Sequence, residues 1–431
     1  MRAALRPLRL PGFANLAFAY LFNELGNWLG EIALAVLVYD QTGSPMATAA
    51  LFFGMHFAPA LLGPPLVAWL EALPVRASLP LLYAAEAIVF AVLALFANDF
   101  LLVAVLALAV VDGSLASASR ALTRAAAAAA LAPAGKLREG NALLNIAFTV
   151  GSAGGPAIAG VVVAGAGIQT ALLADAASFL IVAGVLVSAR SLRLPEERER
   201  RDGWAMRMRR GLAYVRGRVA LRRLLAAQAL AFIFFALVIP IEVVFAKQTL
   251  DTGDAGYGAL LASWGVGMVA GSLLFAALRR VPLRGLLLVS TLGIGVAYLA
   301  TSVSPTLAVA CAASVIGGLG NGVQWIALVT AVQELTTAAY QARVLALLEA
   351  LASAMPGAGF LLGGAIAALF TPRVSYAVAG AGVLVVLGLA AAALRRADWA
   401  PELEQGTAAG GPDGASSVAG APSSGTVLTG P

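Results

Sequence analysis

The chain has 431 residues, of which 61% are hydrophobic and 12% are charged, and its mean hydropathy is +0.90. This composition excludes a water-soluble fold of that size. Since about 20 apolar residues cross the ~30 Å hydrocarbon core of a bilayer, the chain is long enough for roughly a dozen transmembrane helices. The formal net charge of +6 therefore matters mainly through where the basic residues lie.

The composition also argues against an intramolecular disulfide and a metal site. The single cysteine, Cys311, cannot form an intramolecular disulfide. The single histidine, His56, belongs to no Cys/His cluster, so we expect no protein-built metal site and no cofactor. A lone histidine in a membrane helix is more typical of a packing residue than of a proton relay.

Apolar runs between turn residues predict twelve helices, so the expected fold class is an all-α integral membrane protein. The predicted ranges are 13–39, 45–70, 77–97, 100–122, 140–165, 168–190, 222–248, 256–278, 284–302, 305–333, 342–369 and 372–395.

The basic residues predict how these helices are oriented. With twelve helices, 26 of the 28 basic residues fall on one side of the membrane, and Lys247 and Arg373 fall on the other. By the positive-inside rule, both termini are then cytoplasmic, in a multi-pass protein of the inner or plasma membrane. No small-residue cleavage site follows the basic start, which favours an uncleaved first helix.

One polar break divides the chain into two groups of six helices. We predict an amino-terminal bundle over 1–195, an arginine-rich cytoplasmic linker over 196–221, a carboxy-terminal bundle over 222–396 and a disordered tail over 397–431. The second part of the linker, from Trp204 onward, is either a basic amphipathic helix on the anionic inner leaflet or a solvated segment.

The two halves also resemble each other. A shift of 204 residues, without gaps, superposes several glycines and one arginine of each half. These pairs are Gly54 with Gly258, Gly63 with Gly267, Arg76 with Arg280, Gly113 with Gly317, Gly155 with Gly359 and Gly160 with Gly364. Because the shift spans an even number of helices, the repeats are parallel, and this plan places a central site between the halves.

Helix 5 carries the most specific local pattern, Gly151-Ser-Ala-Gly-Gly155-Pro156-Ala-Ile-Ala-Gly160. Together with strings such as Asp175-Ala-Ala-Ser-Phe179, it makes residues 10–396 resemble a major facilitator superfamily transporter of the macrolide-efflux and enterobactin-exporter-like branch. The resemblance implies two parallel six-helix bundles and an antiporter motif in helix 5. Glycines permit close helix contact and Pro156 bends the helix, but ordinary glycine-mediated packing would need the same residues.

The loop between helices 2 and 3 departs from the superfamily pattern G-x-x-x-D-R-x-G-R-R. Glu71 stands in place of the aspartate, Arg76 keeps one cation, and the remaining positions are lost. The chain therefore lacks most residues of the cytoplasmic latch that the resemblance implies.

Acidic residues inside predicted helices are candidates for proton coupling, because charges in a bilayer are costly. Asn23, Glu24, Asn27 and Glu31 share one face of helix 1. Repulsion between its two carboxylates favours protonation of one, as a proton-coupled exchanger requires; alternatively, neighbouring helices and water satisfy this face without titration. Asp112 is the next candidate for coupling, whereas Glu86, Asp175 and Glu349 suggest structural roles.

Polar and aromatic residues in other helices could line a substrate cavity. The candidates are Asn27, Trp28, Glu242, Asn321, Gln324 and Trp325. The alternative for the tryptophans is anchoring at the membrane interface.

These observations predict a secondary transporter. The chain has no phosphate loop of the GxxxxGK[ST] form, which argues against an ATP-driven pump. We expect export of a small, partly hydrophobic molecule of drug, macrolide or siderophore type, by proton-coupled alternating access. An uptake or facilitated-diffusion carrier is the alternative, and a membrane enzyme is less favoured because no acid-base cluster is evident. The expected partners are the substrate, protons and lipid, with no nucleic acid, and the expected state is a monomer.

Overall fold

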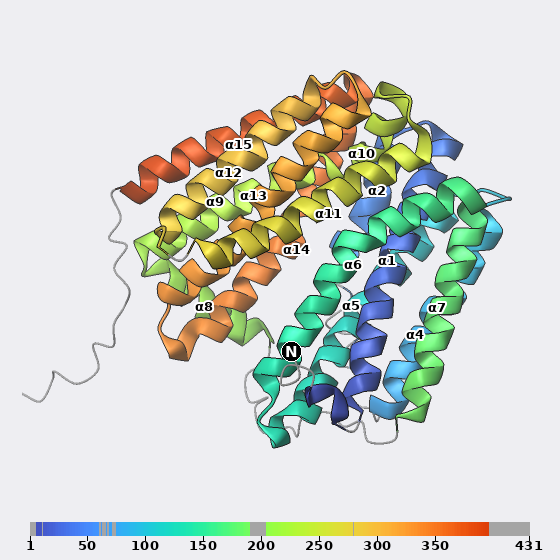
Figure 1. The fold of residues 1–431 in the computed structure, drawn as a ribbon, viewed down its shortest axis with the longest axis horizontal. Helices are drawn as coiled ribbons and strands as arrows, with labels where there is room; N and C mark the ends of the chain where they lie inside the picture. Colours follow the sequence, from blue (N-terminus) through green and yellow to red (C-terminus); the bar gives the residue numbers. More distant parts are fainter. Residues whose placement is uncertain are drawn as a thin grey trace, which may run out of the picture.

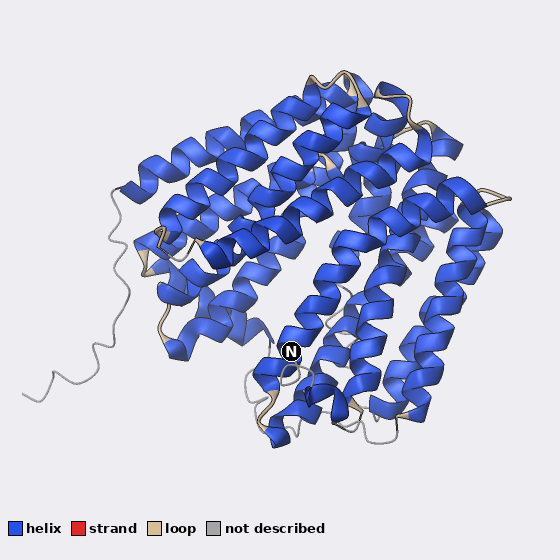
Figure 2. Ribbon diagram, in the orientation of Figure 1, coloured by secondary structure: helices blue, strands red, loops and turns tan. Residues whose placement is uncertain are grey.

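The computed structural model describes residues 6–395, apart from 11, 60–61, 63–65, 67–68, 71–74, 190–203 and 279. Every regular element among these residues is helical (Figure 2). The predicted tail over 397–431 and the first part of the predicted linker lie outside the described residues.

The helices of the first half follow the predicted order. They are η1 (Arg6–Arg9), α1 (Phe13–Thr42), α2 (Pro45–Phe52), η2 (Phe53–Phe57), α4 (Val75–Phe96), α5 (Leu102–Leu131), η3 (Ala132–Ala134), α6 (Leu137–Ala166) and α7 (Ile168–Ser188).

The second half begins with a helix inside the predicted linker. Its elements are α8 (Trp204–Arg216), α9 (Val219–Ala236), η5 (Ile239–Ile241), α10 (Glu242–Val244), η6 (Phe245–Thr249), α11 (Gly253–Ala277), α12 (Leu283–Ser302), α13 (Leu307–Glu334), α14 (Ala338–Leu369) and α15 (Pro372–Arg395).

Among the described residues, ten helical segments are long and apolar enough to cross a membrane. Two predicted spans are not among the ten. The span over 45–70 lies partly outside the described residues, and in α6 the apolar stretch is the shorter Gly154–Ala166. The structure thus has the predicted all-α membrane architecture.

The helices form two bundles (Figure 1). The amino bundle consists of α1, α2 and α4 to α7, and the carboxy bundle consists of α9 to α15. We call the end that carries η1 and α8 the terminal end, and the end where α1 finishes and α11 begins the far end. The bundles approach each other at the far end, near α2 and α10, and diverge toward the terminal end (Figure 1).

Local sequence signals explain the tight far-end turn between α1 and α2. Gly43 adopts a left-handed conformation with φ of 59°, and its N–H donates to the carbonyl oxygen of Tyr39. Ser44 caps α2 by accepting a hydrogen bond from the Ala47 N–H, and Pro45 occupies the first turn. Two residues therefore suffice to reverse the chain.

Two helices are interrupted where they approach the other bundle. Pro240 lacks an N–H donor, and α9 gives way there to the 3-10 turn η5 and then the π-helical turn η6. The second predicted helix contains the π-helical turn η2. Because π-helical turns recur at functional sites, these two turns indicate that the interface between the bundles is a candidate functional region.

Candidate functional site

Glycine contacts bring the two bundles together. A Cβ atom added to Gly160 of α6 would lie 2.7 Å from Cα of Gly258 in α11, so no side chain fits on either helix there. Gly364 of α14 also lies close to α2, where an added Cβ would meet Cβ of Ala49 and would be 3.1 Å from the Pro45 carbonyl oxygen. The two contacts use Gly160 and Gly364, which the repeat relates.

The other glycines of the predicted antiporter motif face their own bundle. A Cβ atom on Gly151 would lie 2.8 Å from Cβ of Glu24, and one on Gly155 would lie 2.9 Å from Cβ of Trp28. Both partners belong to α1. The motif residues thus contact two different helices, since Gly151 and Gly155 pack on α1 whereas Gly160 packs on α11.

An ion cluster joins the bundles at the far end. Lys247 of η6 pairs with Asp40 of α1, and its Nζ lies 2.6 Å from Oδ1 of Asp254 in α11. The side chain of Lys247 is only 16% exposed. One partly buried cation therefore holds carboxylates from both bundles.

A histidine from η2 contacts the predicted acidic face of α1, and the sequence did not suggest this pairing. His56 of η2 lies with Nε2 3.6 Å from Oε2 of Glu31, and its Nδ1 lies 3.2 Å from the Phe52 carbonyl oxygen. A carbonyl only accepts hydrogen bonds, so Nδ1 carries a proton. One further proton is then needed between Nε2 and the Glu31 carboxylate to bond the pair.

This pair lies at the interface between the bundles. The His56 ring stacks on Phe52, and its centroid is 5.7 Å from that of Phe360 in α14 of the carboxy bundle. The His56 side chain is nevertheless 42% exposed and that of Glu31 is 19% exposed. Protein atoms therefore cover neither side chain completely.

Other acids of the amino bundle are buried and incompletely hydrogen-bonded. Glu86 accepts a 3.0 Å hydrogen bond from Ser119, and Asp175 lies against Gly30 of α1. One oxygen atom each of Glu24, Glu86, Asp112 and Asp175 has no hydrogen-bond partner. The amino bundle thus contains carboxyl groups whose charge protein donors compensate only in part.

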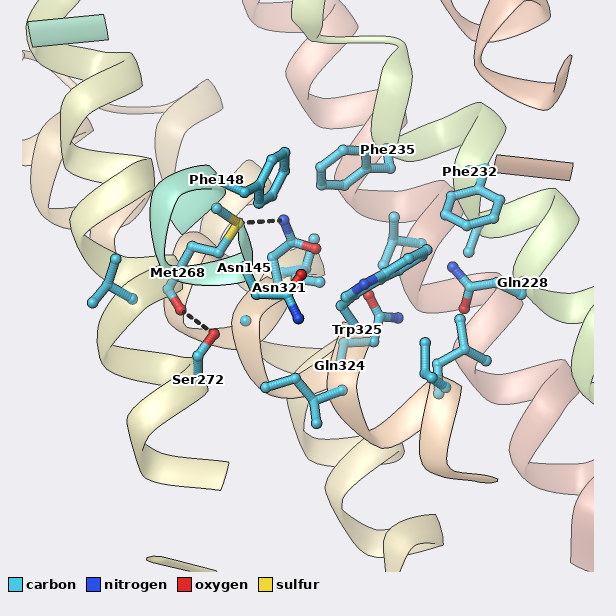
Figure 3. A pocket seen from close by; sticks show the side chains of 18 residues that line it. Asn145, Phe148, Gln228, Phe232, Phe235, Met268, Ser272, Asn321, Gln324 and Trp325 are labelled. Carbon is cyan, nitrogen blue, oxygen red and sulfur yellow. Dashed lines mark hydrogen bonds between the residues drawn. The ribbon is translucent and has the colours of Figure 1, made fainter. Parts of the chain in front are cut away.

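A cavity of about 560 Å³ opens between α9, α11 and α13 of the carboxy bundle and α6 of the amino bundle. Figure 3 shows Trp325 between Asn321 and Gln228, with Phe148 and Phe235 beside them. Its polar lining consists of Asn145, Gln228, Ser272, Asn321 and Gln324, and its aromatic lining of Phe148, Phe232, Phe235 and Trp325. None of the 18 described residues that line it is acidic, basic or a histidine.

Hydrogen bonds hold several of these polar groups in place. Gln324 donates from Nε2 to Oγ1 of Thr291 over 2.8 Å. Ser272 donates to the Met268 carbonyl oxygen over 2.9 Å, and Asn321 Nδ2 lies 3.8 Å from the Met268 sulfur (Figure 3). The cavity wall therefore presents oriented dipoles but no net charge.

The structure brings together only part of the predicted site. Asn321, Gln324 and Trp325 line the cavity, whereas Asn27, Trp28 and Glu242 are not among its lining residues. Glu242 lies at the start of α10, and its Oε2 has no hydrogen-bond partner. Glu71 lies outside the described residues, and of Arg76 only the helical backbone is described.

Sequence reasoning missed the cavity wall that α9 contributes. Gln228, Phe232 and Phe235 line the cavity, and their spacing of four and three residues puts them on one helix face. The polar Gln228 in an otherwise apolar stretch was the available signal.

Comparison with known proteins supports a transporter. The family described as transmembrane secretion effector matches residues 2–409, and no curated protein matches the chain significantly. A mutant of the nucleoside transporter NupG superposes with a TM-score of 0.70 at 12% identity, covering 89% of this chain and 99% of that one. A bacterial homologue of the iron transporter ferroportin, in an inward-facing state, gives 0.68 at 15% identity, covering 89% and 99%. An inward-facing bacterial homologue of the human lysosomal transporter Spinster gives 0.67 at 14%, covering 89% and 96%.

Proposed function

Because the chain belongs to the transmembrane secretion effector family of major facilitator transporters, we propose that it exports a small, partly hydrophobic molecule in exchange for protons. That it is a multi-pass membrane transporter, and not an enzyme, follows from the family and from the similar structures. The direction of transport, the coupling ion and the chemical type of the cargo are the proposal. The macrolide-efflux and enterobactin-exporter branch stays a prediction.

The proposed orientation puts the terminal end in the cytoplasm, where the positive-inside rule places 26 basic residues. The divergence of the bundles toward that end then corresponds to an inward-open state (Figure 1). Gly160 with Gly258, and Lys247 with its two aspartates, close the outer side. Alternating access requires these contacts to separate when the cytoplasmic side closes.

The observation that carries proton coupling is the Glu31–His56 pair. It lies between the bundles, contacts Phe360 of the carboxy bundle, and is only partly covered by protein atoms. A charged carboxylate cannot be sealed into a dry helix interface without a compensating partner. Binding one proton bonds Glu31 to His56 and removes that obstacle, so protonation and closure of the interface favour each other.

The coupling residues and the cargo cavity are separate. Neither Glu31 nor His56 lines the cavity, and Glu24 and Asp112 do not line it either. In this proposal Glu31, with Glu24 and Asp112, carries the exchanged proton. The cargo acts through the cavity, which includes Asn145 and Phe148 of the amino bundle.

A transport experiment with carboxylate variants tests the proposal. Everted vesicles with an imposed pH gradient are assayed with a panel of hydrophobic antibiotics and siderophores, and the strongest accumulated compound is kept as the panel substrate. Glu31→Gln should abolish gradient-driven accumulation but leave downhill movement, because the amide keeps the shape and cannot titrate. Glu139→Gln, which removes a surface carboxylate paired with Lys136 at 2.9 Å, is the matched control.

Two results would contradict the proposal. If Glu24→Gln, Glu31→Gln and Asp112→Asn all retain full gradient-driven accumulation, these carboxylates do not carry the proton. If accumulation occurs only in right-side-out vesicles, the carrier mediates uptake.

A further inference from the structure

We propose that the cavity between α6, α9, α11 and α13 selects an electrically neutral solute that combines an aromatic ring with several amide, carbonyl or hydroxyl groups. This inference rests on the proposed function, because it names the cargo class of that transporter. It excludes cationic amines and anionic siderophores as preferred cargo, and so narrows the expectation drawn from the sequence.

The exclusion of charged cargo follows from what lines the cavity. The 18 described lining residues include no ionisable side chain. A charged solute entering this space would lose its hydration without gaining a counterion, and an unpaired buried charge is strongly disfavoured. The acidic side chains of Glu24, Glu31, Asp112 and Glu242 do not supply a counterion in the cavity wall, because all four are absent from the lining.

The requirement for hydrogen-bonding groups follows from four primary amides. Asn145, Gln228, Asn321 and Gln324 come from three different helices. Each side-chain amide offers both donors and an acceptor, and Gln324 is oriented by its hydrogen bond to Thr291. A purely apolar solute would displace water from the polar atoms that these side chains expose to the cavity without replacing its hydrogen bonds, which costs binding free energy.

The aromatic part follows from four rings around the same space. Phe148 of α6, Phe232 and Phe235 of α9, and Trp325 of α13 all line the cavity (Figure 3). Flat aromatic faces bury large areas and favour offset or edge-to-face contact with another ring. The volume of about 560 Å³ falls in the range of pockets that hold drug-sized ligands.

Three capped dipeptides with one scaffold and different charge test the inference. N-acetyl-Phe-Trp-amide is neutral, N-acetyl-Phe-Trp is an anion and Phe-Trp-amide is a cation at neutral pH. Binding of their tritiated forms to the purified full-length chain in lipid nanodiscs is measured by equilibrium dialysis, without a pH gradient. We expect the neutral compound to bind at least tenfold more tightly than either ion.

Charge placed in the cavity should reverse this order. Gln228→Glu should weaken the neutral compound and raise the affinity of the cation at least tenfold, since it supplies the missing counterion. Asn321→Asp should do the same, and it provides a second variant if Gln228→Glu does not fold. Glu139→Gln, which replaces a partly exposed carboxylate in the first turn of α6 and outside the cavity lining, should leave all three affinities unchanged.

The outcomes distinguish this inference from the proposed function. Equal or tighter binding of either ion by the unmodified protein overturns the inference, as does absence of binding by all three compounds. Either result leaves gradient-driven export untouched, because dialysis requires no gradient. Conversely, loss of proton coupling with preserved preference for the neutral compound would overturn the proposed function alone.

Discussion

The two bundles share a sequence repeat but differ in the chemistry of their interiors. The four buried acidic side chains of the described residues, Glu24, Glu86, Asp112 and Asp175, all lie in the amino bundle. The shift of 204 residues relates them to Gln228, Ser290, Ile316 and Ala379 of the carboxy bundle. The repeat has therefore kept the helices while exchanging every buried carboxylate for a neutral side chain.

The difference is clearest between the first helix of each bundle. Glu24, Trp28 and Glu31 of α1 correspond to Gln228, Phe232 and Phe235 of α9. In α9 these three positions line the neutral cavity, whereas in α1 they form the acidic face that contacts His56 and Gly155. Under the proposed function, the same helix face serves proton chemistry in one bundle and cargo binding in the other.

The largest expected effect comes from breaking the contact that the repeat has conserved. Gly160→Leu should reduce transport of the panel substrate at least hundredfold, because a side chain cannot fit between α6 and Gly258. Gly154→Leu is the matched control on the same helix, since an added Cβ there meets no atom within 4 Å. Transport is measured in everted vesicles at equal protein levels. Full activity of the Gly160 variant would show that transport does not require the close contact of Gly160 with Gly258.

Gly155→Leu tests the other neighbour of the motif. It should also abolish transport, because it displaces Trp28 within the amino bundle. Cross-linking between α6 and α11 then distinguishes the two variants, because only Gly160→Leu should weaken it. Equal loss of cross-linking in both variants would argue against two distinct contacts.

The next effect concerns the cation that joins the bundles. Lys247→Met leaves Asp40 and Asp254 without their shared partner, so the outer closure should open more often. A cysteine at Ala49, next to Gly364 in the closed interface and in a Cys311→Ala background, should react severalfold faster with an impermeant thiol reagent added outside. Arg373→Met is the control, because Arg373 donates to Ser302 within its own bundle over 2.8 Å.

A smaller effect sharpens the chemical contrast between the bundles. Glu24→Gln makes α1 match α9 at this position, and it should lower gradient-driven accumulation severalfold because one buried carboxylate of the acidic face is lost. Binding of N-acetyl-Phe-Trp-amide should not change, since Glu24 lies outside the cavity lining. A large loss of binding would mean that the two functions share residues.

Much of the fold could be predicted from the sequence, because hydrophobic periodicity and turn residues act locally. The α7 and α15 ranges, for example, differ from prediction by at most two residues. Contacts between helices are harder to predict from the sequence. The pairing of Glu31 with His56 depends on how α1 packs against η2, and the role of Gln228 depends on α6 reaching across to the carboxy bundle. Neither depends on spacing along one helix.

The smallest expected effect tests to which bundle the linker helix is attached. The sequence left α8 as either a helix on the membrane surface or a solvated segment, but the structure packs it against α14. Tyr214 accepts a 2.9 Å hydrogen bond from the Thr337 N–H and stacks on Tyr340. The centroid of its ring lies 3.6 Å from Cζ of the Arg218 guanidinium.

Tyr214→Phe removes the hydroxyl and keeps the ring stack, so it should weaken this attachment by about 1 kcal/mol. Hydrogen exchange of α8 backbone amides should then rise severalfold, while transport and the preference for the neutral dipeptide stay unchanged. Tyr214→Ala, which also removes the stack with Tyr340 and the contact with Arg218, should give a larger increase. If neither variant changes the exchange of α8, its attachment to the carboxy bundle depends on other contacts, such as that of Gly211 with the Arg343 backbone.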